Sequence, residues 1–85
     1  MILEYTFRNQ ELHQIIFIIE PWAEEVTVPP GSTVSLTIFH TKPGLIETSL
    51  TPDYFTIWLW GSCTVTAYLD QKELVMPSLA VPAPI

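Results

Sequence analysis

The sequence predicts an all-β fold, a small antiparallel β-sandwich or barrel of about seven short strands with jelly-roll or Greek-key-like connections. Three observations lead to this prediction. Apolar and polar residues alternate over several runs, which is typical of half-buried strands. Proline- or glycine-containing turns separate these runs about every 8–12 residues. No window of the 85 residues shows a convincing helical period. The pattern alone leaves sandwich and barrel as alternatives.

The first two predicted strands differ in burial. Residues 14–20 (QIIFIIE) are β-branched and aromatic on both alternating faces, which indicates a central strand that ends at Pro21. Residues 25–28 form a shorter strand that stops at the Pro-Pro-Gly sequence of residues 29–31. The second proline presets φ and Gly31 accepts a positive φ, so a type II turn is expected there.

The next two strands are separated by a second Pro-Gly turn. Residues 33–40 alternate cleanly, and the side chains that should face the core are Val34, Leu36 and Ile38. The turn at residues 42–45 then leads into a strand at residues 45–50.

The last three predicted strands follow a turn at residues 51–53. Residues 54–60 come first, and Gly61 breaks the pattern before residues 62–69. The core-facing side chains of this second run should be Cys63, Val65, Ala67 and Leu69. A turn at residues 70–71 then leads into a final strand at residues 72–76.

We expect a single β domain over residues 1–76 and a proline-rich, apolar C-terminal arm over residues 77–85. The arm (PSLAVPAPI) contains three prolines and no charge, so it cannot form an inner strand. An extended arm that covers a sheet edge or a groove is expected instead. A domain of this size has a marginal core, so a homo-oligomer or a tight complex with another protein is expected to stabilise it.

The composition excludes several classes of partner. The chain has 3 Lys and Arg against 9 Asp and Glu, a net charge of −6, and only 14% of its residues are charged. So few cations cannot neutralise several phosphates, which excludes nucleic acid and anionic membranes as partners. No targeting segment and no apolar run long enough to span a bilayer is evident. A single cysteine cannot form an internal disulfide, which favours the cytoplasm.

Three short motifs resemble those of a group of short uncharacterised bacterial proteins. They are EPWAE at residues 20–24, PPG at residues 29–31 and WLWGS at residues 58–62, and the resemblance spans about residues 18–74. The final hairpin of such proteins often turns through Asp-Gly, whereas this chain has Asp70-Gln71. The resemblance therefore does not define the turn type, and it implies no activity.

No metal site or cofactor is expected from the sequence. His13, His40, Cys63 and Met76 formally match a copper set. However, such a site normally has a histidine a few residues after the cysteine, and none follows Cys63. The two histidines are also 27 positions apart without a neighbouring ligand, so we interpret both as structural.

No catalytic residue is expected either, and the chain is predicted not to be an enzyme. Cys63 shares the inward face of its strand, and apolar burial suppresses the reactivity of a thiol. Glu20, Glu24 and Glu25 flank Trp22, but adjacent carboxylates in a strand point oppositely and make a poor acid–base pair. A solvated acidic edge that blocks unwanted strand pairing is the favoured interpretation.

The aromatic row of residues 54–60 is the strongest functional signal. A period of two puts Tyr54, Thr56, Trp58 and Trp60 on one face and an apolar set on the other. The candidate interface residues are therefore Tyr54, Trp58, Trp60 and Trp22. The same face is equally compatible with burial inside a central strand. A small protein-interaction domain that self-associates is the predicted function, and a ligand- or carbohydrate-binding module using the aromatic face is the alternative.

Overall fold

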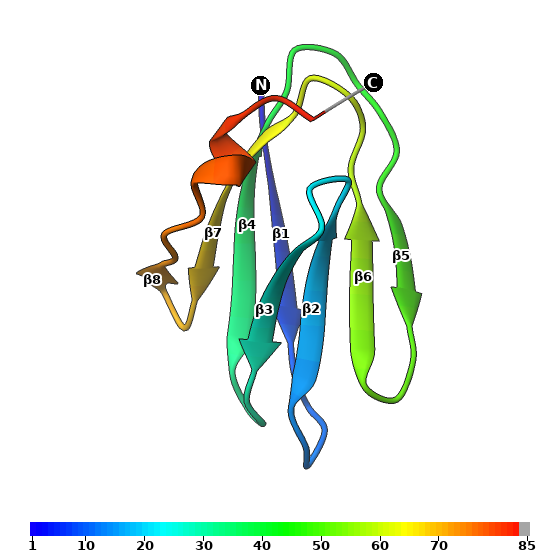
Figure 1. The fold of residues 1–85 in the computed structure, drawn as a ribbon, viewed down its shortest axis with the longest axis vertical. Coiled ribbons are helices and arrows are strands. Elements are labelled where there is room, and N and C mark those ends of the chain that lie inside the picture. The colour runs from blue at the N-terminus through cyan, green and yellow to red at the C-terminus, as the bar shows by residue number, and fades with distance from the viewer. Residues whose placement is uncertain (84–85) are drawn as a thin grey trace.

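The computed structural model describes residues 1–83 and contains eight strands and one short 3-10 helix within them (Figure 1). The strands are β1 (Ile2–Arg8), β2 (Ile15–Glu20), β3 (Glu24–Val28), β4 (Thr33–Phe39), β5 (Glu47–Leu50), β6 (Tyr54–Trp58), β7 (Thr64–Leu69) and β8 (Lys72–Glu73). The helix η1 is Pro77–Ala80. The predicted all-β class is confirmed.

The strands form two four-stranded sheets that pack face to face as a β-sandwich. Sheet A has the order β1-β4-β7-β8, and sheet B has the order β3-β2-β6-β5. All pairs are antiparallel except β2 with β6, which run parallel in the centre of sheet B. The strand at residues 14–20, predicted to be central, is indeed paired on both sides.

The core lies between the sheets and follows the alternation of the sequence. In β4, the predicted inward residues Val34, Leu36 and Ile38 are fully buried. Aromatic rings fill one end of this layer, where the centroid of Phe55 lies 4.4 Å from that of Phe7 and 5.3 Å from that of Phe17. Such rings bury the most apolar area per residue and stabilise small cores strongly.

The type II turn at residues 29–32 forms as predicted. Gly31 has a φ of 81°, and the Ser32 N–H donates to the carbonyl of Pro29 at 3.1 Å. The final hairpin turns through Asp70 and Gln71 with φ values of 49° and 71°. Two successive positive φ values between β7 and β8 are those of a type I′ turn.

The strand β1 was missing from the sequence-based prediction. Leu3, Tyr5 and Phe7 alternate with polar residues, as expected for a half-buried strand. Glu4 and Arg8 lie on its exposed face. Four predicted strands were too long by two residues or more. The strand predicted at residues 45–50 is Glu47–Leu50, that at 54–60 ends at Trp58, that at 62–69 begins at Thr64, and that at 72–76 is only Lys72–Glu73.

The C-terminal segment also differs from its prediction, because residues 77–80 are helical rather than extended. Leu79 on η1 is only 1% exposed and belongs to the core. Further along, the Ala83 N–H donates to the Cys63 carbonyl at 2.8 Å, and the Ser62 N–H donates to the Ala83 carbonyl. Proline at the start of η1 suits a short helix, since its missing N–H would be unpaired there anyway. Residues 84 and 85 of the predicted arm lie outside the described residues.

Candidate functional site

The outer face of sheet B places Trp58 between two carboxylates. Trp58 on β6 is in register with Glu20 on β2 and with Glu47 on β5. Partners in register on neighbouring strands point to the same face and have closely spaced Cβ atoms. The Trp58 side chain is 42% exposed, so an indole ring and two carboxylates are presented to solvent in one row.

The rows below continue this surface with apolar and hydroxyl groups. Ile18 is in register with Thr56 and Glu25, and Ile16 with Tyr54 and Thr27. We call this surface the acidic aromatic face, and its members are Ile16, Ile18, Glu20, Glu25, Thr27, Glu47, Ser49, Tyr54, Thr56 and Trp58. The four strands of sheet B contain no Lys or Arg. The face therefore combines half-exposed aromatic area with three carboxylates, and its own strands carry no cation.

A hollow of about 440 Å³ lies beside Trp58, at the end of β6. Its lining includes Leu45, Glu47, Leu59 and Trp60 together with Trp58. Leu45 is strongly exposed here, so the hollow offers apolar contact area as well as the Glu47 carboxylate. A side chain that enters it would contact both indoles and one carboxylate.

Trp60 also fixes the loop between β4 and β5. Its indole N–H donates to the carbonyl of Lys42 at 2.9 Å, and the ring of His40 packs on its edge. Any side chain at Gly44 would collide with the indole ring, so glycine is required there for close packing. Trp60 thus shapes one wall of the hollow from a half-buried position.

The four predicted interface residues are not all on one surface. Tyr54 and Trp58 lie on the acidic aromatic face, and Trp60 joins Trp58 only at the hollow. Trp22 is elsewhere: it packs against the core, and its indole N–H donates to the Val81 carbonyl at 2.9 Å. Trp22 therefore holds the C-terminal segment instead of extending the aromatic row.

The cysteine lies where the sequence predicted it. Cys63 is fully buried as a free thiol. Burial raises the pKa of the Cys63 thiol above its ordinary value, and a backbone hydrogen bond from Trp60 opposes this only in part. A protonated, inaccessible thiol is a poor nucleophile.

The histidines serve as structural contacts. His13 Nε2 lies 2.7 Å from the Pro52 carbonyl, which ties the β1–β2 loop to the β5–β6 turn. His40 packs against Trp60 in the other half of the molecule. Within residues 1–83, no three His, Cys, Asp or Glu side chains are grouped so that they could hold a metal ion.

The predicted acidic edge is divided between two environments. Glu24 accepts a hydrogen bond from the Ser78 hydroxyl and so anchors η1 to β3. Glu20 and Glu25 instead belong to the acidic aromatic face. Glu47, the second carboxylate beside Trp58, was not singled out by sequence reasoning. Its place depends on the register of β5 with β6, which is set by the hairpin turn at residues 51–53.

Comparisons with known proteins add no relatives to this description. Searches with protein-family models, among curated proteins and among solved structures find no significant match. In the described part of the chain, no helix has the length and apolar character needed to cross a membrane.

Proposed function

We propose that this protein is a non-enzymatic protein-interaction module whose acidic aromatic face binds a basic segment of another protein. The observation that carries the proposal is the row in which Trp58 stands between Glu20 and Glu47. The chain has a single cysteine, which is free, and free cysteines are typical of reducing compartments, so we propose the cytoplasm as its location.

The chemistry of this row suits a lysine or arginine side chain. A cation over an indole face gains about 0.5–1 kcal/mol at an exposed site and more when water is excluded. Each exposed carboxylate partner adds about 0.2–1 kcal/mol. The neighbouring Ile16 and Ile18 supply apolar area against which the stem of a long cationic side chain can pack. Each contribution is small, so the face suits a partner with several cations.

The same charges argue against self-association through this face. A twofold-symmetric dimer would place each patch against an identical patch. The carboxylates of Glu20, Glu25 and Glu47 would then share one interface with the same three carboxylates of the second copy, and bringing six like charges together is unfavourable. We therefore assign the face to a different protein, rather than to the homo-oligomer expected from composition.

Carbohydrate binding is the second candidate. Trp58 and Trp60 line one hollow with Glu47, and a carboxylate there would accept hydrogen bonds from sugar hydroxyls. Because Trp22 is engaged by Val81, the platform available to a sugar is limited to these two rings. A neutral ligand would leave the other two carboxylates of the face without partners, so this candidate ranks second.

The test is the affinity for a basic peptide with cations on one side. We choose a fluorescein-labelled octapeptide of alternating lysine and serine, because alternate side chains of an extended peptide point to one face. Its binding should be saturable, should weaken with salt, and should fall about tenfold on Trp58→Ala. Glu20→Gln and Glu47→Gln should each weaken binding about threefold to fivefold, as expected for exposed pairs.

The matched control is Glu73→Gln, which removes the same charge from an exposed position on sheet A. It should leave the dissociation constant nearly unchanged. Equal losses at positions 73 and 47 would show that only net charge attracts the peptide, and the proposal would be wrong. Binding of cellohexaose that Trp58→Ala abolishes, without any peptide binding, would favour the carbohydrate alternative.

A further inference from the structure

Among residues 1–83, sheet A has no strand opposite β5, the edge strand of sheet B (Figure 1). β5 forms the edge of sheet B, and all four of its residues are exposed. Yet Thr48 and Leu50 are in register with Ile57 and Phe55, which point into the core. In Figure 1, β5 lies beyond β1, where sheet A provides no strand to cover it. Leu50 consequently leaves 66% of its surface in contact with water.

The neighbouring edge of sheet A has unpaired backbone groups. Met1 and His40 exchange both of their backbone hydrogen bonds, and the Asn9 N–H donates to the Ser32 carbonyl. Hydrogen bonding in an antiparallel pair alternates along the strand. The backbone N–H and C=O groups of the odd-numbered residues of β1 therefore point towards β4. The N–H and C=O groups of Glu4, Thr6 and Arg8 therefore point to the free edge, since β4 is the neighbour of β1 within the described sheet.

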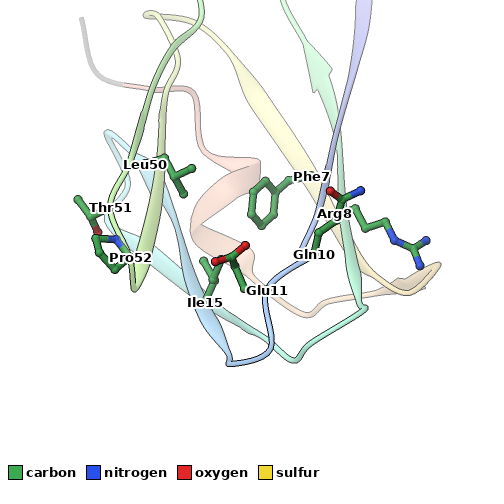
Figure 2. Close-up of a pocket in the computed structure, with 8 residues that line it drawn as sticks. All are labelled: Phe7, Arg8, Gln10, Glu11, Ile15, Leu50, Thr51 and Pro52. Atoms are coloured by element: carbon green, nitrogen blue, oxygen red, sulfur yellow. The ribbon is translucent and has the colours of Figure 1, made fainter.

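A hollow of about 430 Å³ opens between these two edges, near the β1–β2 loop. Figure 2 shows Phe7 and Leu50 on opposite sides of it, with Ile15 lower in the view between them. The Arg8 side chain points away from the centre of the hollow, whereas the Glu11 carboxylate lies beside Ile15 (Figure 2). The hollow is large enough to accept an aliphatic or aromatic side chain from an added strand.

We propose that this edge accepts an extended segment of a partner protein as a fifth strand of sheet A, antiparallel to β1. Addition of a strand to an exposed sheet edge is an established mode of peptide recognition. The segment would span the seven residues of β1, with apolar side chains at alternate positions over Leu50 and the hollow. On the other face it would carry a cation opposite Glu4 and a carboxylate opposite Arg8, four residues apart. This edge is distinct from the acidic aromatic face.

A second copy of the chain does not fit as the occupant. In each copy the inner face of β1 is already covered by sheet B, with the ring centroid of Phe7 5.6 Å from that of Phe17 and 4.4 Å from that of Phe55. If β1 of a second copy paired with β1 here, its own sheet B would enter the space that β5 occupies. A lone strand has no such second layer.

The probe is a labelled peptide with the sequence of residues 2–10 (ILEYTFRNQ), which has the required charge order. Paired antiparallel about Thr6, its arginine lies opposite Glu4 of the protein and its glutamate opposite Arg8. We expect saturable binding to the full chain by fluorescence anisotropy. Exchanging the glutamate and the arginine within the peptide should weaken binding at least tenfold, because like charges then face each other at both positions.

Two aspartate substitutions at exposed apolar positions of the protein test whether binding depends on the hollow. Leu50→Asp should weaken binding of the peptide at least tenfold. Val75 is 91% exposed and does not line the hollow, so Val75→Asp should leave binding unchanged. Both positions are exposed, so neither variant should unfold. The proposal is wrong if no saturable binding occurs below about 1 mM, a binding free energy of about −4 kcal/mol. It is also wrong if the charge exchange has no effect, which would indicate that the peptide simply replaces β1. Dimers of the full chain in light scattering that Leu50→Asp dissociates would equally overturn it, since the occupant would be a second copy.

Discussion

The Asn9 side chain forms hydrogen bonds to the backbone of three other residues. Its side-chain N–H₂ donates to the carbonyls of His13 and Val28, both at 2.9 Å, and its Oδ1 accepts the Glu11 N–H. The residue is fully buried. A buried amide with satisfied partners fixes the loop between β1 and β2, and so positions both sheets at this end.

Asn9→Ala is therefore expected to be strongly destabilising. The change leaves two carbonyls and one N–H without their partner, and the free energy of unfolding should fall by about 2–3 kcal/mol. Urea denaturation followed by tryptophan fluorescence measures this value. Gln14→Ala, at an exposed position of the same loop, should change it by less than about 0.5 kcal/mol. A loss at position 9 no greater than at position 14 would contradict this role.

Asp70 should make the stability of the hairpin depend on pH. The backbone N–H of Thr33, which donates to Asp70 Oδ1 at 2.9 Å, lowers the pKa of the Asp70 carboxyl, and the Ser32 side chain adds to this effect. A lowered folded-state pKa gives stability that is present above the unfolded value of about 3.9 and is lost as pH falls through the folded value.

The side-chain carboxyl carbon of Asp70, followed by NMR, should thus titrate below about pH 3.9. In Asp70→Asn the decline of stability in this acidic range should be smaller than in the parent protein. A midpoint at or above the unfolded value would show that the hydrogen bond from Thr33 does not favour the ionised form.

At the scale of elements, the type I′ turn between β7 and β8 has a residue that does not suit its backbone. Gln71 adopts a φ of 71°, where glycine has no steric penalty but other residues do. We expect Gln71→Gly to raise the free energy of unfolding by about 0.5 kcal/mol, the relief of strain exceeding the added chain entropy. Gln71→Ala should give no gain in the same denaturation assay, and a loss with glycine would refute the turn assignment.

The helix η1 is an integral part of the core, and this gives a second prediction for an element. Leu79→Ala removes a side chain that is almost completely buried, so it should cost about 2–4 kcal/mol of stability. Val81→Ala truncates a neighbouring aliphatic side chain that is mostly exposed, and it should cost less than about 0.5 kcal/mol. Similar thermal unfolding of both variants would mean that η1 is detached in solution.

The sequence was most informative where burial alternates along one strand. The inward faces of β4 and β7, the central position of β2 and the Pro-Pro-Gly turn follow from local pattern, because each reflects a single strand or a four-residue turn. A period of two is also present in β1, where Leu3, Tyr5 and Phe7 alternate with polar residues, so this strand was predictable as well. The core contact of Leu79, in contrast, depends on a fold that returns the chain end to Cys63.

The candidate site shows the same limit. Trp58 and Tyr54 were identified from the period of their own strand. Glu20 became a neighbour of Trp58 only through the parallel pairing of β2 with β6, which are far apart in sequence, whereas Glu47 pairs with Trp58 across the β5–β6 hairpin. Pairing between distant strands is determined by the whole core, so the place of Glu20 was not predictable locally, whereas the register of a hairpin such as β5–β6 follows from its turn.

At the scale of the whole molecule, the two sheets present different surfaces. The outer face of sheet B carries aromatic rings and carboxylates, whereas the β1–β5 side has free backbone groups and an uncovered apolar strip. We propose that a single small sandwich uses these surfaces as two separate interfaces, one that recognises side-chain charge and one that recognises an extended backbone. The central proposal is that the acidic aromatic face binds a basic segment of another protein.

The three tryptophan indoles allow this claim to be tested directly. Those of Trp22 and Trp60 donate to backbone carbonyls within the chain, whereas among the described residues the Trp58 N–H has no such acceptor. We would follow all three indole N–H signals by NMR while titrating the alternating lysine–serine peptide. The account predicts that the Trp58 signal shifts with saturation, that Trp60 moves less, and that Trp22 stays in place. Saturable shifts at Trp22 without a shift at Trp58, or no shifts in any indole, would contradict it.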